Sequence, residues 1–284
     1  MRKGIAFIFL LMLLSAILIP YGCTDKKPEP VDTIQADTIL EDTIVQDSTE
    51  NVIAETPMPK AADELFDDFI FNFAANGKLQ RKRIVFPLPV YRDGKMERKI
   101  EKRKWEMERF FMRQGYYTLI LDNQKQEEAV KDTTVNHVAI EKIHFNSETV
   151  QTYCFDKIRG EWMLTAMRYQ PIDKNRNASF LRFYDHFSTD SAFQVQSLAD
   201  EVEFTAPDPD DDFSTITGVI MPQQWFDFKP GIIPSGLIYN VIYGRKYDNS
   251  DQKILVIRGI ANGLEMEMIF ERMGEHWKLV KFYS

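Results

Sequence analysis

The C-terminal stretch of the chain reads Phe270-Glu-Arg-Met-Gly-Glu-His-Trp-Lys-Leu-Val-Lys-Phe-Tyr-Ser284. The same pattern occurs earlier, as Phe155-Asp-Lys-Ile-Arg-Gly-Glu-Trp-Met-Leu-Thr-Ala-Met-Arg-Tyr169. An offset of 115 residues takes Phe155 to Phe270, Trp162 to Trp277 and Leu164 to Leu279. A period of this length corresponds to a whole small domain, because solenoid units recur every ~20–50 residues. The sequence therefore predicts two similar lobes, over residues 61–172 and 173–284.

Composition agrees with a globular protein. The chain has 284 residues, of which 44% are hydrophobic and 27% charged, enough for two hydrophobic cores. The formal net charge is −8, and it becomes −10 if Arg2 and Lys3 are removed with an N-terminal signal. An acidic chain is a poor general ligand for phosphate backbones, so we expect no nucleic-acid partner.

The N-terminus has the pattern of an export signal over residues 1–22. Arg2 and Lys3 precede an apolar run at residues 5–19, which is short for a membrane span of ~20 residues. The following Gly22-Cys23 resembles the lipobox of bacterial lipoproteins, although Pro20 and Tyr21 stand where Leu and a small residue are usual. This resemblance implies a lipid on Cys23, membrane attachment and a place in the cell envelope, periplasmic or outer-membrane associated. Secretion with cleavage nearby and an uncleaved anchor are the alternatives.

Residues 23–60 differ in composition from the rest. Asp-Thr-Ile recurs at Asp32, Asp37 and Asp42, prolines stand at both ends, and Thr24 to Lys60 contains no aromatic residue. Such a segment buries too little apolar surface to offset its ordering entropy, so we expect a lipidated, disordered tether. In the alternative interpretation, its isoleucines dock on a partner as an added strand.

Each lobe has the pattern of helix first and strands afterwards. The first lobe predicts helices over 61–79 and near 104–113, then strands over 116–121, 138–145, 149–155 and 162–169. The second predicts a helix that Ser179 caps, then strands over 236–243, 253–261, 264–270 and 277–283. The expected fold class is α+β, with a helix or helices packed on a curved antiparallel sheet in each lobe.

Both lobes close on a turn followed by Trp-x-Leu, at Trp162-Met-Leu164 and Trp277-Lys-Leu279. In this they resemble the nuclear-transport-factor-two-like (cystatin-like) superfamily. The whole chain also resembles a family of Gram-negative cell-envelope lipoproteins with two such lobes and no assigned function. The superfamily includes isomerase-like and cyclase-like enzymes as well as noncatalytic binding and dimerisation modules, so fold alone does not decide function.

Lobes of this kind have a conical pocket between helix and sheet. Six aromatic residues fall where the resemblance places that pocket: Trp105, Tyr116, Tyr117, Trp225, Tyr239 and Tyr243. The competing interpretation, which is the favoured one, is that these rings fill the core.

Other candidates for chemistry are few. Cys154 aligns with Ile269, which predicts a buried thiol rather than a reactive one. Asp185-His186 is the best acid/base candidate, but neighbours in sequence do not face each other on a helix. The sequence has no zinc pattern, phosphate loop or nucleophile elbow, so we expect no metal, no cofactor and no catalytic residue that can be named.

Charges differ between the copies. The interval between Phe86 and Trp105 is basic, whereas its counterpart contains the acidic run Asp208-Pro-Asp-Asp-Asp212. Two interpretations follow: the loops face each other at the lobe junction, or the basic one meets an anionic partner. The default is solvated charge without a partner.

The resulting hypothesis is a noncatalytic lipoprotein that binds a small ligand or an envelope protein. The first alternative is an isomerase- or cyclase-like enzyme with an acid/base group in one pocket. The second is a structural module that dimerises.

Overall fold

The computed structural model describes residues 60–284 except 209, 245–249, 261 and 284. The described residues belong to one compact unit, Thr43–Ser284. The predicted signal and the tether with Cys23 lie outside them. Among the described residues, no helix is both long and apolar enough to cross a membrane.

The first half, residues 60–172, begins with helices. They are η1 (Lys60–Asp63), α3 (Phe66–Ala75) and α4 (Gly77–Lys82). The periodic face of α3 is buried, but the helix expected over 61–79 is interrupted at Asn76. The reason is local: Asn76 is extended, and its side chain accepts hydrogen bonds from the N–H groups of Lys78 and Leu79, which starts a new helix.

Six strands complete the first half. They are β1 (Leu88–Arg92), β2 (Lys95–Ile100), β3 (Tyr116–Leu121), β4 (His137–His144), β5 (Thr149–Ile158) and β6 (Glu161–Pro171). The short 3-10 helices are η2 (Lys102–Lys104), η3 (Phe110–Arg113) and η4 (Gln124–Lys131). The helix predicted over 104–113 is therefore wrong; Phe110 has φ of 47°, which a continuous α-helix does not accommodate.

The second half, residues 173–284, repeats this order. Its helices are α5 (Ala178–Thr189), α6 (Ser191–Gln196) and α7 (Trp225–Phe228), with η5 (Ile172–Lys174) and η6 (Pro222–Gln224). Its strands are β7 (Leu198–Asp208), β8 (Asp211–Ile220), β9 (Leu237–Tyr243), β10 (Gln252–Gly259), β11 (Glu265–Met273) and β12 (His276–Tyr283). The four predicted strands of each half are confirmed, whereas hairpin strands β2 and β8 were not predicted.

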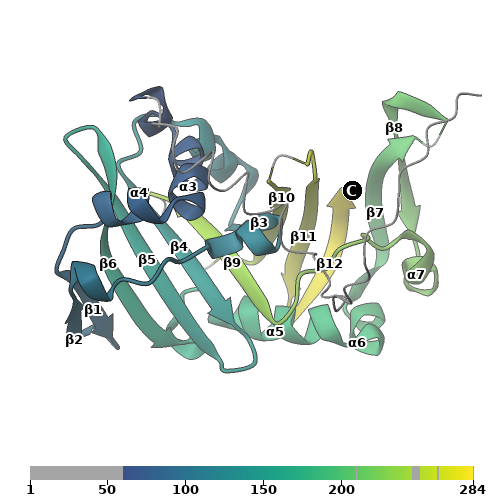
Figure 1. Cartoon of the computed structure of the whole chain (residues 1–284). Helices are drawn as coiled ribbons and strands as arrows, with labels where there is room; N and C mark the ends of the chain where they lie inside the picture. The colour runs from purple at the N-terminus through teal and green to yellow at the C-terminus, as the bar shows by residue number, and fades with distance from the viewer. Residues whose placement is uncertain (1–59, 209, 245–249, 261, 284) are drawn as a thin grey trace, which may run out of the picture. The chain divides into compact units, whose positions relative to one another are not determined.

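All these strands lie in one curved sheet rather than in two. Their order is β2-β1-β6-β5-β4-β9-β3-β10-β11-β12-β7-β8 (Figure 1). Two equivalent strands have changed places at its centre, since β9 pairs with β4 of the first half and β3 pairs with β10 of the second. Because β3 and β9 are apolar on both faces, each can be buried only in the middle of a covered sheet.

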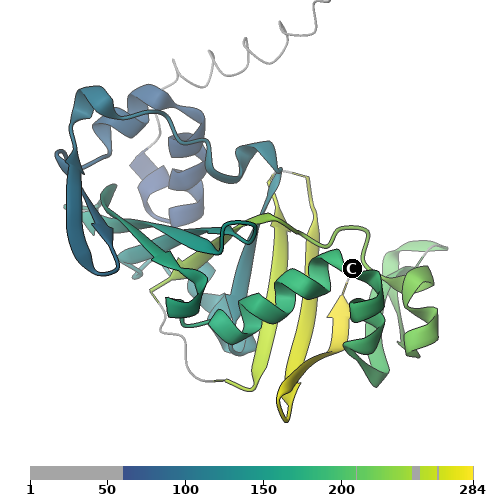
Figure 2. The same ribbon diagram turned by 90° about the horizontal axis from the view of Figure 1, so that it is seen from below.

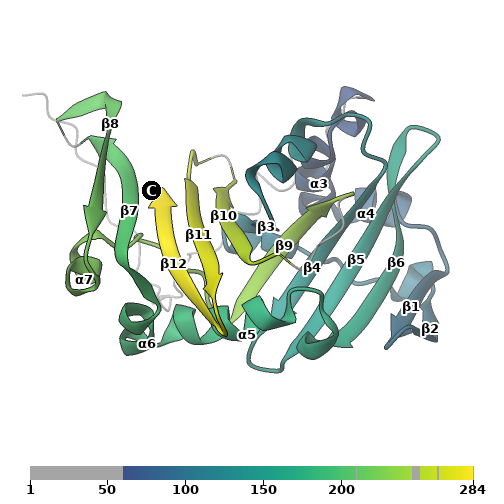
Figure 3. The same cartoon turned by 180° about the vertical axis from the view of Figure 1, so that it is seen from behind.

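The two halves cover opposite faces of this sheet. Helix α3 lies in front of it in Figure 1, and α5 lies in front when the sheet is viewed from behind (Figure 3). Figure 2 shows the same separation from below. Alternate residues of β10 divide accordingly, because Ile254 and Val256 join one core and Leu255 and Ile257 the other. The α+β class is confirmed, with two cores on one shared sheet.

The two quoted stretches pack in the same way. Trp162 meets Phe66 edge-on at 5.1 Å and 80°, and Trp277 meets Phe180 at 5.5 Å and 78°. Both Phe155 and Phe270 follow a register shift in their strands, within the β5–β6 and β11–β12 hairpins. The tryptophans of the quoted stretches therefore occupy equivalent surroundings.

The charged intervals do not face each other. The basic one contains β2 and the acidic one contains the start of β8, and these strands are at opposite edges of the sheet. The interpretation in which the two loops pair across a junction is wrong, and the reason is the sheet order.

Candidate functional site

The six predicted pocket aromatics divide between the two cores. Trp105, Tyr117, Tyr239 and Tyr243 belong to the core under α3, while Trp225 belongs to the core under α5 and Tyr116 packs against it. The strand exchange explains why Tyr239 and Tyr243, from the second half, lie in the first core. Only Trp105 lines one of the three pockets described below.

The two tryptophans of this set are held in the same way. The indole Nε1 of Trp105 donates to Oε1 of Gln80 over 3.0 Å, and that of Trp225 donates to Oε1 of Gln194 over 3.0 Å. Both glutamines are buried, so each amide satisfies a donor that would otherwise be unpaired in the core.

A second pair of the predicted aromatics converges on a carboxylate. Asp67 on α3 accepts a hydrogen bond from the hydroxyl of Tyr117 at 3.2 Å and another from Tyr243. Burial raises the pKa of Asp67 above its usual range, while the two tyrosine hydroxyls oppose this rise. The cluster depends on the strand exchange, because Tyr117 is on β3 and Tyr243 is on β9.

The first half contains an open pocket of about 490 Å³ at the end of the α3 core. Exposed side chains of Arg98, Lys99 and Lys104 line its mouth, and Trp105 and Met167 supply apolar surface. Exposed Glu106 also lines the pocket, but neither Lys99 nor Lys104 forms an ion pair with the described residues, so positive charge exceeds negative charge at the mouth. Its volume lies within the ~300–1,000 Å³ range of small-ligand sites.

Glu108 is the central polar group of this pocket. Its Oε2 accepts from the hydroxyl of Tyr153 at 2.6 Å and from Nζ of Lys142 at 3.0 Å, and its Oε1 accepts from the N–H of Phe110 at 3.1 Å. Phe110 has a positive φ, and this strained backbone aims its N–H at the carboxylate. Burial and the charge of Glu108 raise the pKa of Tyr153 far above its usual range, so its hydroxyl stays a donor.

The equivalent place in the second half is closed. The cross-strand pair Tyr153 and Met167 corresponds to Met268 and Phe282, both fully buried. Phe282 stacks on Phe204 with centroids 6.0 Å apart and planes at 21°. Aromatic packing therefore fills in one copy the space that is open in the other.

The second half has its own openings, beside α5. One pocket of about 550 Å³ lies between α5, the end of α6 and the β11–β12 turn. It contains His186 and His276, the two histidines that the sequence places in this half. A smaller pocket of about 250 Å³ adjoins it and shares Ser179 and Trp277.

No group of described residues has the composition of a metal site. His186 lies in ring contact with Phe193 at 5.6 Å, and the structure shows no hydrogen bond from it to Asp185. The candidate Asp-His pair therefore does not form a dyad here. Cys154 is buried as predicted, and burial raises the pKa of its thiol.

Glu108, Tyr153 and Asp67 were not identified from the sequence. Asp67 and Glu108 belong to charged stretches that resemble solvated surface. The alignment of the two copies contains a usable signal for Tyr153, because it places a hydroxyl where the other copy has apolar Met268.

Comparisons with known proteins agree with this architecture. A solved structure of an NTF2-like protein from Bacteroides fragilis NCTC 9343 is 41% identical in sequence, covers 80% of this chain and 98% of its own, and superposes with a TM-score of 0.72. No curated protein matches the chain. The family described as a domain of unknown function, DUF4348, matches residues 45–284. The chain has an NTF2-like fold and belongs to the DUF4348 family.

Proposed function

We propose that the protein is a noncatalytic binding module of the cell envelope, and that the pocket of the first half receives a small anionic ligand. The observation that supports this most directly is the Glu108 cluster beneath an open, positively charged mouth. Lys142 compensates the charge of Glu108, and Lys99 and Lys104 outnumber the remaining carboxylate of the lining, Glu106, so the pocket favours an anionic group. Trp105 and Met167 offer apolar surface to the remainder of the ligand.

The arrangement of Glu108 favours binding over proton transfer. Three donors fix its two oxygens, so the carboxylate is positioned rather than free to exchange protons with a substrate. Gln151 donates to the Tyr153 hydroxyl over 2.6 Å, which continues the fixed set of polar groups along the wall of the pocket. Such pre-positioned groups confer orientation on a ligand at low entropic cost.

A binding titration tests the proposal. The probe is naphthalene-2-sulfonate, which combines an anionic group with flat apolar rings, titrated into residues 43–284 by calorimetry. We expect the double variant K99S/K104S to weaken binding at least about tenfold, or ~1.4 kcal/mol. The matched control K125S/K131S removes two exposed lysines outside the pocket and is expected to bind as the wild type does. Equal affinity of all three proteins contradicts the proposed site.

The envelope location rests on the N-terminus, from Arg2 to Cys23. Its test is mass spectrometry of the mature protein from the membrane fraction, which should begin at an acylated Cys23. The variant Cys23→Ser is expected to leave the membrane fraction. Recovery of an unmodified Cys23 in the wild type excludes the lipoprotein assignment, whatever the pocket binds.

One observation favours the enzyme alternative. Asp67 has a raised pKa and accepts from two tyrosine hydroxyls, a combination suited to acid/base chemistry. It lines none of the three pockets described above. Isomerisation of an enolisable ketone that is lost in Asp67→Asn and retained in Glu108→Gln would favour this alternative over binding.

Another observation favours the dimerisation alternative. Large apolar side chains are exposed along the free edge strand β8 and on the segment after it: Ile216, Val219, Met221, Phe226 and Phe228. Exposed apolar surface of this kind often marks a contact with another protein. Light scattering of residues 43–284 tests dimerisation. A dimer that the double variant V219K/F226K converts to a monomer would support this alternative.

A further inference from the structure

In the first half, one arginine closes the space between α3 and the β5–β6 hairpin. Two guanidinium nitrogens of Arg83 each donate to an oxygen of Asp63 over 2.8 Å. The same group lies 3.3 Å from a Glu161 oxygen and above the ring of Phe69, 5.9 Å from its centroid. Arg83 and Asp63 are both buried, so this ion cluster seals the first half at that point.

The second half has the same backbone and a different side chain there. The carbonyl oxygen of Ser197 accepts from the N–H of Leu279 at 2.8 Å, and the N–H of Ser197 donates to the carbonyl of Phe193 at 2.9 Å. The backbone of Arg83 makes the same two hydrogen bonds, with Leu164 and with Leu79. An offset of 114 residues takes Asp63 to Asn177 and Arg83 to Ser197, and the offset of 115 residues takes the turn glutamate Glu161 to His276. The cation and both of its carboxylate partners are thus replaced by residues without a formal charge at neutral pH.

The pocket of about 550 Å³ lies where the arginine is missing. Ser197 and Phe183, the counterpart of Phe69, both line it, and so does His276. The adjoining pocket reaches Asn177, which is 2% exposed. The amide nitrogen and oxygen of Asn177 have no hydrogen-bond partner among the described residues. A buried amide without partners costs free energy of ~1–3 kcal/mol, so its place is suited to a hydrogen-bonding ligand.

We propose that this cavity in the second half binds a saccharide. Hydroxyl groups of a sugar can both donate and accept, which matches the serine, glutamine, histidine and asparagine side chains that surround the cavity: Ser179, His186, Gln196, Ser197, His276 and Asn177. Phe183, Phe193 and Trp277 provide flat apolar surface for a sugar ring. This site lies outside the anionic-ligand pocket of the proposed function and does not depend on it.

The charge of the walls selects among sugars. Arg182 and Lys278 line the cavity with one carboxylate, Glu275, and Arg182 also pairs with Asp173. Arg176 and Arg272 line the adjoining pocket with one carboxylate, Asp251. Neutral and acidic sugars are compatible with this excess of positive charge. A ligand with a guanidinium or ammonium group would take the place that Arg83 occupies in the first half. The second half lacks both of the carboxylates that hold Arg83, so it offers such a ligand no equivalent partner.

The test uses the full chain, purified in a detergent that carries no sugar. Glucose, N-acetylglucosamine and glucuronic acid serve as probes in saturation-transfer NMR and calorimetry. We expect at least one of them to bind, and Ser197→Arg to weaken its binding at least about tenfold by refilling the cavity. Ser197→Ala keeps the cavity open and is expected to stay within about threefold of the wild type. Asn146→Ala, in an exposed turn of the other half, is the control and is expected to leave sugar binding unchanged.

The variant N177D/S197R recreates the buried ion pair of the first half and guards against a folding defect of Ser197→Arg alone. If this double variant has the same melting temperature as the wild type, its loss of sugar binding results from the closed cavity and not from a folding defect. Should neither arginine variant fold, H186A/Q196A removes two polar groups from the wall and must weaken binding for the proposal to stand. Absence of binding by all three sugars, or undiminished binding in a folded arginine variant, overturns the proposal.

Discussion

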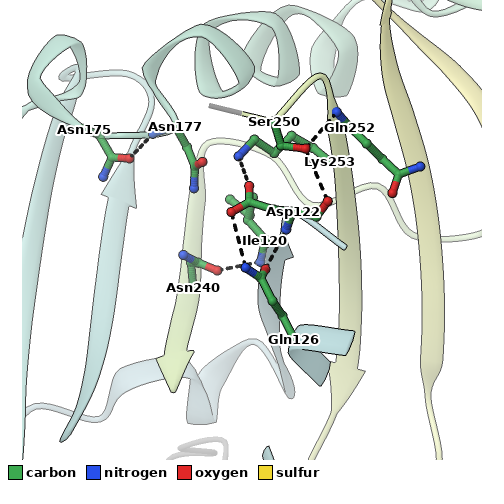
Figure 4. A network of polar contacts seen from close by, with 9 residues as sticks. All are labelled: Ile120, Asp122, Gln126, Asn175, Asn177, Asn240, Ser250, Gln252 and Lys253. Atoms are coloured by element: carbon green, nitrogen blue, oxygen red, sulfur yellow. Dashed lines mark hydrogen bonds and ion pairs between the residues drawn. The ribbon is translucent and has the colours of Figure 1, made fainter. Parts of the chain in front are cut away.

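The amide of Asn240 donates to the carboxylate of Glu141 over 3.0 Å, at the line where the two halves exchange strands. The Oδ1 atom of Asn240 accepts from the N–H of Ile120 over 2.8 Å (Figure 4). With Glu141 on β4 and Ile120 on β3, this one side chain connects β9 to both of its neighbours. Glu141 also accepts from Asn175 over 2.8 Å. All four residues are buried, so the centre of the sheet contains a polar cluster without access to bulk water.

Asn240→Ala should therefore destabilise the fold strongly. It leaves a buried carboxylate oxygen and a buried backbone N–H without these partners, at ~1–3 kcal/mol each, or about 2–6 kcal/mol in all. The measurement is the free energy of unfolding in urea. Asn146→Ala, in an exposed turn, is the control and should change it by less than ~0.5 kcal/mol. A small effect of Asn240→Ala would mean that the cluster does not hold the exchanged strands together.

The raised pKa of Asp67 gives the stability a pH dependence of known sign. In the unfolded chain the pKa is near 3.8, and in the folded protein burial raises it. Between these two values the folded protein binds more protons, so the contribution of Asp67 to stability falls as pH rises through this window. We expect the melting temperature of the wild type, minus that of Asp67→Asn, to decrease as pH is raised from about 3.8. A difference that is constant or increases with pH would show that the pKa is not raised.

The ion pair of Arg83 and Asp63 should be costly to break from one side only. Arg83→Ser leaves the carboxylate of Asp63 buried without its cation, for which ~3–5 kcal/mol is typical. The double variant D63N/R83S reproduces the pair Asn177 and Ser197 of the second half, so it should recover much of that loss. Urea unfolding of both variants measures this difference. Equal destabilisation would indicate that the second half tolerates its neutral pair for another reason.

Neither half should fold alone. Residues 43–172 lack β9, which covers the edge of β4, and residues 173–284 lack β3, which covers the edge of β10. Each fragment then exposes an edge and an apolar face, which favours association or unfolding. We expect dispersed NMR spectra only when the two fragments are expressed together and recovered as a one-to-one complex. A monomeric fragment with a dispersed spectrum would show that the exchange is dispensable.

Local structure followed closely from the sequence. The apolar periodicity of α3, the Trp-x-Leu strands and the alternation of β11 are properties of neighbouring residues, which a pattern records directly. The second-half helix and the four main strands of each half were predictable for that reason. Regions where backbone geometry depends on contacts elsewhere were not predictable, such as the 3-10 turns around Phe110 that present an N–H to Glu108.

The sequence by itself determined the α+β class and the equivalent surroundings of Trp162 and Trp277. Only the tertiary structure decided that β3 and β9 change places, that the cores lie on opposite faces, and that Asp67 meets Tyr243. The alternation of apolar and polar residues along a strand shows which of its faces is buried. It carries no information about which strand will lie beside it. Two copies of one unit make the choice harder still, because equivalent strands present nearly the same edge to either neighbour.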